Sequence, residues 1–437
     1  MKKILLVGSE ARGHCIAETL KRSATSCDVV CFGSSDNPGI KKVTSAYEVG
    51  KLDDLGSIVV FAKAQKVDFA VISPELPLSV GVVDALEKAG MPSVGPLKKL
   101  AQLESSKSFT RDLLEEFNIF GNPKFKVFKN NEGLAEWVKE VGQFVIKPDG
   151  LTCGKGVLVQ GDHFASYEEG IDRTETLIKK DGKVVLEEKL VGQEFSLISL
   201  CDGDHLLHFP AVQDHKRAFV GDEGPNTGGM GSYSMADGSL PFLQESDIKA
   251  SRSINEQVAK ALKKKFGMDY KGVLYGGFIA VKDGVRLIEY NARFGDPEAI
   301  NILPVLKSNF VKVCEAVIDG TLDQIVPEFL EQATVCKYIV PEGYPTSAVK
   351  DKLVDISKID TSKVKIYFAS VNEKENGLYL AGSRAIALVG TDPDLYKAEE
   401  KVETEIKKIT GPVFHREDIG TKELIEKRIG ILRGIRG

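Results

Sequence analysis

The most informative segment of this chain is Arg286-Leu287-Ile288-Glu289-Tyr290-Asn291-Ala292-Arg293-Phe294-Gly295-Asp296-Pro297-Glu298. Its first six residues alternate at strand spacing, so Glu289 and Asn291 are expected on the same side of a β-strand. A carboxylate and an amide oxygen side by side suit a hard cation such as Mg²⁺, and Arg293 follows as a planar fork for a carboxylate or phosphate. The segment predicts a metal and anion site at a strand end, with an ordinary surface turn as the alternative.

The strand has a partner just before it in the sequence. Val273–Val281 and Val285–Asn291 flank Asp283-Gly284, a pair of residues typical of a tight hairpin turn. An amphipathic helix is predicted over Ile248–Phe266. The pattern predicts a β-hairpin that carries the Glu289/Asn291 pair.

A glycine-rich loop with an embedded lysine, Pro148–Gly156, lies between two predicted strands. A Walker loop runs from strand to helix and has a hydroxyl residue after its lysine, whereas Gly156 follows Lys155, so a P-loop ATPase is disfavoured. Backbone N–H groups of such a hairpin can fold over phosphates, and Lys147 would point toward the same phosphates. A plain hairpin turn with a surface lysine is the alternative.

A predicted strand end at Glu187–Gly192 has two acids and then a glycine, which indicates a hinge between domains. Its backbone could pair with an adenine edge, and Glu194 could accept from ribose hydroxyls; an exposed charged strand end is the alternative. A single helix is predicted over Leu97–Glu116. The glycine-rich, charged stretch Gln213–Gly231 predicts a long loop that acts as a lid. His215 within it has no second His or Cys at ligand spacing, which favours a hydrogen-bonding role over a metal site.

The N-terminal part alternates short apolar runs with helical patterns. Lys3–Val7, Asp28–Phe32 and Phe69–Ile72 predict buried strands, and the βαβ rhythm predicts a parallel sheet with helices on both faces. Loops after the carboxyl ends of such strands usually bind ligands, which here are Gly8–Gly13 and Ser73–Leu78. The first lacks the glycine pattern that cradles a dinucleotide, so an NAD-dependent oxidoreductase is a weak alternative.

Composition and charge limit the classes of protein to which this chain could belong. The 437 residues are 42% hydrophobic and 28% charged, with a net charge of −5, which predicts roughly three soluble globular domains. No basic run is interleaved with aromatics, so nucleic acid is not expected as a partner. The seven scattered cysteines indicate reduced thiols and a cytoplasmic protein. No window approaches the ~18 apolar residues that would predict a membrane span.

Together these segments resemble the phosphoribosylamine–glycine ligase (glycinamide ribonucleotide synthetase) family of the ATP-grasp superfamily. The matching motifs stand in the family's order over essentially the whole chain: Leu103–Lys107, Ile146–Val157, Gln213–Arg217, Gly224–Gly231 and Glu289–Glu298. The resemblance implies ATP-dependent ligation of glycine to 5-phosphoribosylamine through a glycyl phosphate. The expected products are glycinamide ribonucleotide, ADP and phosphate, in de novo purine biosynthesis.

The resemblance also implies an α/β architecture. It comprises a Rossmann-like N-terminal domain (1–100), an ATP-grasp central domain (101–124 and 192–327), a mobile lid subdomain (125–191) and a small C-terminal α+β domain (328–437). The expected ligands are ATP, Mg²⁺ or Mn²⁺, and the two small substrates. A monomer, or else a dimer, is expected.

Site residues follow from the resemblance position by position. Those implied to bind ATP are Lys107, Lys147, Gly154, Lys155, Gly156, Glu187, Leu190 and Glu194. Those implied to bind substrate are Glu75, Asp214, Lys216, Asn226, Thr227, Gly228, Arg293 and Gly295. Arg293, Lys147, Asp214 and Lys216 are implied to be catalytic, and Glu289 and Asn291 to hold the metal.

The sequence departs from the family pattern where the phosphoribosyl group is expected. The opening turn Gly8–His14 has fewer glycines than the family and lacks its Arg-Glu-His, and Ser73-Pro74-Glu75 replaces a Gly-Pro-Glu. Gly382-Ser383-Arg384 stands where the family tends to have Gly-Gly-Arg. Alternatives are another ATP-grasp carboxylate ligase, such as a carboxylase acting on bicarbonate, or a non-catalytic nucleotide-binding sensor.

Overall fold

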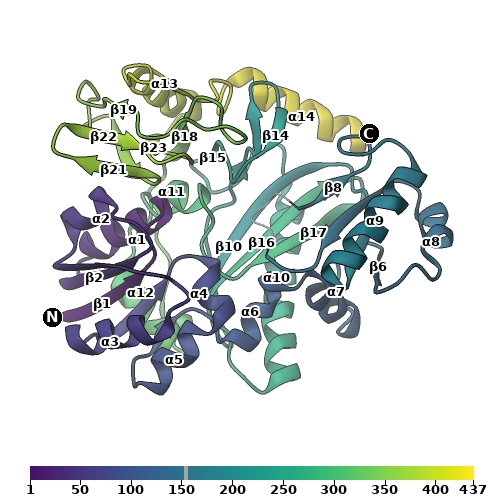
Figure 1. Ribbon diagram of the computed structural model, residues 1–437, viewed down its shortest axis with the longest axis horizontal. Coiled ribbons are helices and arrows are strands. Elements are labelled where there is room, and N and C mark those ends of the chain that lie inside the picture. Colours follow the sequence, from purple (N-terminus) through teal and green to yellow (C-terminus); the bar gives the residue numbers. More distant parts are fainter. Residues whose placement is uncertain (152–155) are drawn as a thin grey trace.

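The fold is described from a computed structural model that covers residues 1–151 and 156–437 (Figure 1). Its N-terminal unit is a parallel sheet in the order β3-β2-β1-β4-β5 with helices on both faces. Strand β1 (Lys2–Val7) sends Ile4 and Leu6 into one apolar core and Leu5 and Val7 into another. This burial on both faces confirms the Rossmann-like parallel sheet.

The other elements of this unit follow in βα alternation. They are α1 (Ala11–Lys21), β2 (Cys27–Gly33), α2 (Pro38–Val43), β3 (Ala46–Val49), α3 (Leu55–Gln65), β4 (Phe69–Ile72), α4 (Glu75–Val80), α5 (Val82–Lys88) and β5 (Ser93–Val94). The prediction of a loop over Ser73–Leu78 is wrong from Glu75 onward, because α4 begins there directly after the strand.

Two helices, α6 (Lys98–Ser105) and α7 (Lys107–Glu116), replace the single helix predicted over Leu97–Glu116. Ser106 is extended between them, and its side chain accepts a hydrogen bond from the N–H of Phe109. A serine in this conformation caps a new helix. The break makes Lys107 the first residue of α7.

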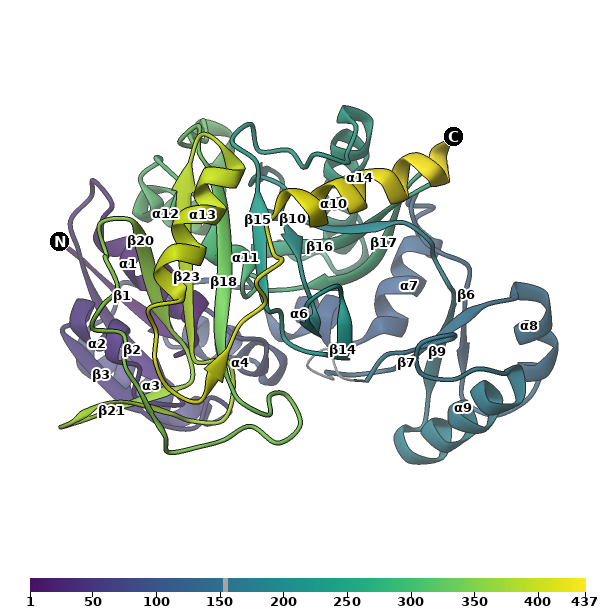
Figure 2. The same ribbon diagram turned by 90° about the horizontal axis from the view of Figure 1, so that it is seen from above.

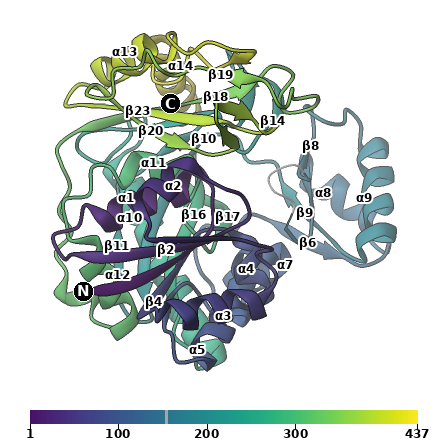
Figure 3. The same cartoon turned by 60° about the vertical axis from the view of Figure 1, so that its left-hand side comes forward.

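A four-stranded antiparallel sheet in the order β6-β9-β7-β8 belongs to a unit that we call the lid unit (residues 125–188), which Figures 2 and 3 show projecting from the rest of the molecule. It has its own apolar core, which includes Phe144 and Leu186. Its elements are β6 (Phe125–Phe128), α8 (Leu134–Val141), β7 (Phe144–Pro148), β8 (Leu158–Val159), α9 (Tyr167–Asp181) and β9 (Val184–Glu188).

The central antiparallel sheet runs in the order β11-β10-β16-β17. The predicted hairpin is confirmed: β16 (Lys271–Val281) pairs with β17 (Gly284–Asn291), and Gly277 lies opposite Glu289. The remaining elements here are β10 (Gln193–Asp202), β11 (Leu206–His208), α10 (Glu245–Phe266), α11 (Glu298–Ile302), α12 (Phe310–Asp319) and the 3₁₀ turn η1 (Leu322–Gln324).

The stretch Gln213–Gly231 is largely strand, so the prediction of an unstructured loop is wrong. β12 (Gln213–Asp214) pairs with β15 (Gly231–Ser234), and β13 (Arg217–Phe219) pairs with β14 (Glu223–Asn226). These strands are too short to show a hydrophobic period. β13 and β14 form a local hairpin, and only β15 pairs with a strand that is distant in the sequence. β15 pairs with β18 (Ala333–Pro341) of the C-terminal unit.

The C-terminal unit is mixed α and β, as predicted. Its main sheet runs β12-β15-β18-β23-β20, with a small sheet β19-β22-β21 beside it. The elements are β18 (Ala333–Pro341), β19 (Leu353–Val354), β20 (Val364–Phe368), β21 (Val371–Lys374), β22 (Gly377–Leu380), β23 (Ile386–Asp392), α13 (Leu395–Ile406), β24 (Val413–Phe414) and α14 (Lys422–Arg436). Across the described residues, no helix is both long and apolar enough to cross a bilayer.

Candidate active site

A cavity of about 330 Å³ lies where the units of the molecule meet. Its walls come from the loop after β1, the start of α4, helices α6 and α7, and the first residues of the glycine loop. The end of β17 and the turn that follows it form another wall, together with β12–β15 residues and Arg384 of the C-terminal unit. Segments from every part of the sequence therefore contribute to one space.

The predicted metal pair lies in this cavity wall at the end of β17. Glu289 faces Gly277 across the hairpin, and Lys216 Nζ is 3.9 Å from its Oε1. Burial alone would raise the pKa of Glu289, but the charges of Lys216, Lys147 and further cations outweigh it and lower the pKa. An ionised carboxylate beside an amide oxygen fits a hard divalent cation.

Arg293 joins the metal pair to two further carboxylates. Its Nη2 donates to Asn291 Oδ1 at 3.0 Å and lies 3.2 Å from Glu104 Oε1, while Nε donates to Glu75 Oε2 at 3.2 Å. Burial opposes ionisation of Glu75, but Arg293 and Arg12 lower its pKa to about 2. The guanidinium is thus held firmly in place, and an anionic substrate would have to share it with these acids.

A buried ion triad connects the lid to the central sheet. Arg111 binds both oxygens of Glu187, at 2.7 and 2.9 Å, and Lys147 Nζ lies 2.8 Å from Glu187 Oε2. Both cations also donate to the carbonyl of Ile288 on β17. Arg111 and Lys147 therefore occupy the Glu187 carboxylate, so any contact of this residue with adenine would have to be made by its backbone.

The start of the glycine loop is docked on the N-terminus of α7. Asp149 accepts from the N–H of Ser108 at 3.1 Å and from the hydroxyls of Ser106 and Ser108. Lys107 Nζ donates to the carbonyl of Gly150 at 2.5 Å. The capping break at Ser106 is what brings this lysine to the cavity.

Two further carboxylates, Asp214 and Glu298, line the same cavity. Tyr275 donates to Glu298 Oε1 at 2.5 Å, and Ser196 bonds the Tyr275 hydroxyl at 2.7 Å. Burial raises the pKa of Asp214 well above its ordinary value, and the charge of Glu298 raises it further. A Cβ at Gly295 would lie 2.2 Å from Glu298 Oε2, so glycine at position 295 leaves room for the Glu298 carboxylate.

Asp296 joins three units at the edge of the cavity. Its Oδ1 accepts from Tyr338 of β18 at 2.5 Å and lies 3.2 Å from Arg384 Nη1, and its Oδ2 accepts from the N–H of Arg12 in α1 at 3.3 Å. Arg384 also donates to the carbonyls of Gly228 and Gly229. These contacts fix the turn after β17 against both outer units.

Comparison with known proteins places the chain in a family. The phosphoribosylglycinamide synthetase N domain matches residues 2–104, the ATP-grasp (A) domain 105–299 and the C domain 334–422. The chain is 45% identical over 444 residues to the phosphoribosylamine–glycine ligase of Methanocaldococcus jannaschii, covering 99% of this chain and 100% of the relative. That of Methanocella arvoryzae is 42% identical over 435 residues, with full coverage of both. The chain belongs to the phosphoribosylglycinamide synthetase family.

Solved structures agree with this membership. The phosphoribosylamine–glycine ligase of Thermotoga maritima has a TM-score of 0.80 at 28% identity. The match covers 95% of the present chain and 100% of the Thermotoga maritima chain. A biotin carboxylase domain of Hydrogenobacter thermophilus 2-oxoglutarate carboxylase, in complex with MgADP, ADP and bicarbonate, has a TM-score of 0.72 at 16% identity. It covers 99% of this chain and 94% of its own, and it shows a shared fold alone.

Most of the synthetase residues predicted from the sequence line the cavity. They are Glu75, Lys107, Glu187, Asp214, Lys216, Thr227, Gly228, Glu289, Asn291 and Arg293. Lys147 is buried on β7, Leu190 is half-buried between β9 and β10, and Glu194 lines a small neighbouring cavity beside Lys216. Asn226, Gly295 and Gly156 are outside the lining, and Gly154 and Lys155 lie outside the described residues.

Several cavity residues were not predicted. Glu298 ended the opening segment and Glu104 lay within a family motif, so both carried a signal that went unused. Arg384 also stood in a quoted motif, but its approach to the cavity depends on the fold of the distant C-terminal unit. Arg111 had no signal, because a buried arginine in an amphipathic helix looks like a surface residue.

His215 does not have the hydrogen-bonding role predicted for it. Its side chain is buried, and neither ring nitrogen has a hydrogen-bond partner among the described residues. Burial lowers its pKa to about 3, helped by the charges of Arg416 and Arg428. The ring is therefore neutral at ordinary pH.

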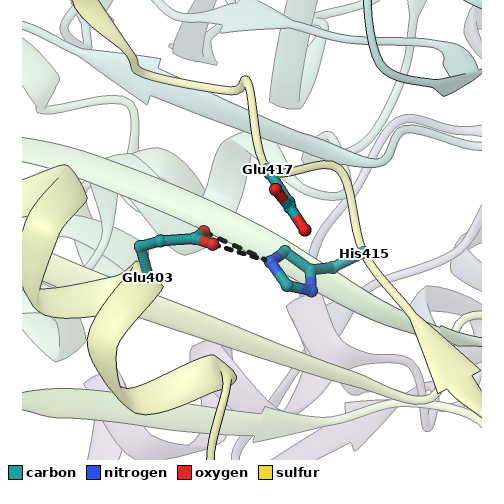
Figure 4. A group of neighbouring side chains, drawn as sticks. All are labelled: Glu403, His415 and Glu417. Atoms are coloured by element: carbon teal, nitrogen blue, oxygen red, sulfur yellow. Dashed lines mark hydrogen bonds and ion pairs between the residues drawn. The ribbon is translucent and has the colours of Figure 1, made fainter.

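A second group of possible metal ligands, Glu403, His415 and Glu417, lies in the C-terminal unit (Figure 4). Lys337 Nζ lies 2.6 Å from Glu403 Oε2, and Lys407 Nζ lies 3.0 Å from its Oε1. Partial burial opposes ionisation, but hydrogen bonds from His415 and Lys337 hold the pKa of Glu403 well below its usual range. Because ammonium groups already neutralise this acid, the cluster is an ion-pair network.

Proposed function

We propose that this protein joins glycine to 5-phosphoribosylamine at the expense of ATP, giving glycinamide ribonucleotide, ADP and phosphate. One observation carries the proposal: the Glu289/Asn291 pair, Lys107, Lys216 and Arg293 all face one cavity. The chain also matches phosphoribosylamine–glycine ligases along its whole length. Family membership supports ATP and a divalent metal, and Mg²⁺ or Mn²⁺ is the proposed ion.

At the nucleotide end, Lys107 and Lys147 would offset charge on the ATP phosphates. The glycine loop, including Gly154, Lys155 and Gly156, would close over them. The hinge backbone from Glu187 to Leu190 would contact adenine, and Glu194 would bind ribose. The proximity of Lys216 to both Glu194 and Glu289, at 3.8 and 3.9 Å, supports a nucleotide that reaches from the small cavity to the metal pair.

The chemistry needs an activated carboxylate, because an amine cannot displace oxide from glycine at neutral pH. Transfer of the γ-phosphoryl group would make glycyl phosphate, and the amine would then displace phosphate. The protein's task is mainly positioning and charge neutralisation. A bound cation would supply charge neutralisation at Glu289 and Asn291.

At the substrate end, Arg293 would hold the glycine carboxylate, since its fork lies beside the metal pair. Asp214 and Lys216 would contact the reacting groups. Asn226, Thr227 and Gly228, together with Glu75 and Gly295, would shape the pocket for the two substrates. The contacts of Arg384 to Gly228 and Gly229 support a rigid pocket wall.

The decisive assay measures ADP release with each substrate omitted in turn. We expect release to require both glycine and freshly made phosphoribosylamine. Release with bicarbonate in place of glycine would refute the proposal in favour of a carboxylase, and nucleotide binding without turnover would indicate a sensor. With ¹⁸O in the glycine carboxylate, the released phosphate should carry the label.

A further inference from the structure

The N-terminal unit contributes two carboxylates to the cavity, and their surroundings differ. Glu75 Oε2 lies 3.2 Å from Arg12 Nη2 and 3.2 Å from Arg293 Nε, so its charge is neutralised by two guanidinium groups. The nearest cation to Glu10 is Arg12, whose Nε lies 3.9 Å from Glu10 Oε2, beyond hydrogen-bond distance. Glu10 is thus the less neutralised of the pair.

The side chain of Glu10 does not cap the helix that it precedes. Glu10 is the N-cap residue of α1, where a carboxylate can accept from backbone N–H groups and stabilise the helix. Its side chain makes no such bond; instead, Oε2 accepts from the hydroxyl of Ser73 at 3.1 Å. Ser73 follows β4 directly, so the hydrogen bond holds the carboxylate at the carboxyl edge of the parallel sheet.

The backbone of the opening turn packs closely around this carboxylate. A Cβ at Gly13 would make an ordinary contact, 3.5 Å from Glu10 Oε2, whereas a Cβ at Gly8 would lie only 2.9 Å from that oxygen. The Glu10 side chain remains 29% exposed and lines the cavity. The turn therefore presents a fixed carboxylate to the cavity in place of capping its helix.

We propose that Glu10 binds the amino group of the ribosylamine substrate and accepts its proton as the amide forms. This inference rests on the proposed function and adds a residue to it. The amine lone pair makes the new C–N bond to the acyl carbon of glycyl phosphate. The C–O bond to phosphate breaks, phosphate leaves with that electron pair, and the amine proton passes to the Glu10 carboxylate.

The charges around Glu10 suit a base. Burial raises its pKa, Arg12 on the same helix opposes this, and Glu75 of α4 and Asp296 of the turn after β17 raise it further. Ser73 is the neutral donor facing it. A carboxylate whose pKa is raised toward working pH is a better proton acceptor than an ordinary one.

The test separates the two half-reactions. Hydroxylamine can intercept glycyl phosphate as glycine hydroxamate without the ribosylamine, so it reports activation of glycine alone. In Glu10→Gln we expect kcat/KM for phosphoribosylamine to fall at least about 30-fold, since general-base catalysis typically contributes ~10²–10⁴-fold. Hydroxamate formation should stay within about threefold of the unaltered protein, which also shows that the variant folds. Glu10→Asp, which keeps a carboxylate, should recover part of the loss.

Glu331→Gln, an exposed acid before β18, is the matched control and should change neither rate. Equal losses of hydroxamate and amide in Glu10→Gln would overturn the inference, because a structural role would affect both steps. No loss in either would overturn it as well. If the unaltered protein makes hydroxamate but no amide from phosphoribosylamine, that result refutes the proposed function and, with it, the role of Glu10.

Discussion

Replacing Arg111 with methionine would break the buried triad that ties the lid to the central sheet. Arg111 makes two charge-assisted bonds to Glu187, at 2.7 and 2.9 Å, and both side chains are almost fully buried. Removing one partner of such a pair typically costs ~3–5 kcal/mol. Lys147 remains 2.8 Å from Glu187 and still offsets its charge, so we expect the lower end, about 3 kcal/mol.

The double variant Arg111→Met/Glu187→Gln also removes the acid, which Arg111→Met leaves with one cation in place of two. Burial already lowers the pKa of Lys147, so this lysine can stay buried uncharged once its acid is gone. We therefore expect the double variant to be more stable than Arg111→Met by about 1–2 kcal/mol, a clear departure from additivity.

Urea unfolding measures both effects. The single tryptophan, Trp137, lies on α8 and reports the lid, while far-UV circular dichroism reports the whole chain. Arg173→Met is the matched control, because its ion pair with Glu169 is exposed on the same unit and should be worth less than about 1 kcal/mol. A double variant less stable than Arg111→Met would refute the reasoning.

Three further predictions concern the cavity. Glu289→Gln should lower turnover at least about 100-fold without unfolding, measured over a metal titration, and near-normal turnover would contradict its role. Lys107→Met should raise the KM for ATP roughly tenfold, equivalent to about 1.4 kcal/mol, and an unchanged KM would remove it from the phosphate site. The Glu75 pKa is about 2 in the folded protein against an ordinary value of 4.5, so the unfolded chain binds its proton first as pH falls. The stability of the unaltered protein relative to Glu75→Gln should be greatest above pH 4.5 and lost toward pH 2, by urea unfolding at each pH.

Patterns within a single element were sufficient to predict much of the fold. The β16–β17 hairpin follows from two strand patterns around Asp283-Gly284, and the buried strand β1 follows from its apolar run. The same reasoning failed at Ser106, because the apolar stripe continues across the break and the cap is recognisable only in three dimensions. It failed at β13–β14 because three- and four-residue strands show no period.

Some residues of the site could likewise be predicted from a local sequence pattern, whereas others are brought together only by the fold. Glu289, Asn291 and Arg293 are close in sequence, so their proximity could be inferred from strand geometry. Arg111 and Glu187 are 76 residues apart, and their pairing depends on how the lid docks on α7. The hydrogen bond between Glu10 and Ser73 likewise joins the ends of two neighbouring parallel strands. Such contacts depend on topology and register, which residue patterns alone do not specify.

The segment from Glu289 to Glu298 connects the proposed site of phosphoryl transfer with the proposed site of amide formation. Glu289 and Asn291 lie at the proposed phosphate end, and Arg293 contacts Asn291 and Glu75. Asp296 accepts from the backbone N–H of Arg12 in α1, the helix that begins beside Glu10. Groups held by a strand and a braced turn keep their separation better than groups on independent loops. If phosphoryl transfer and amide formation occur at opposite ends of this segment, its rigidity fixes the distance over which the amine must reach the acyl carbon. Loosening the turn should then slow amide formation more than glycine activation, because only amide formation requires both ends at once.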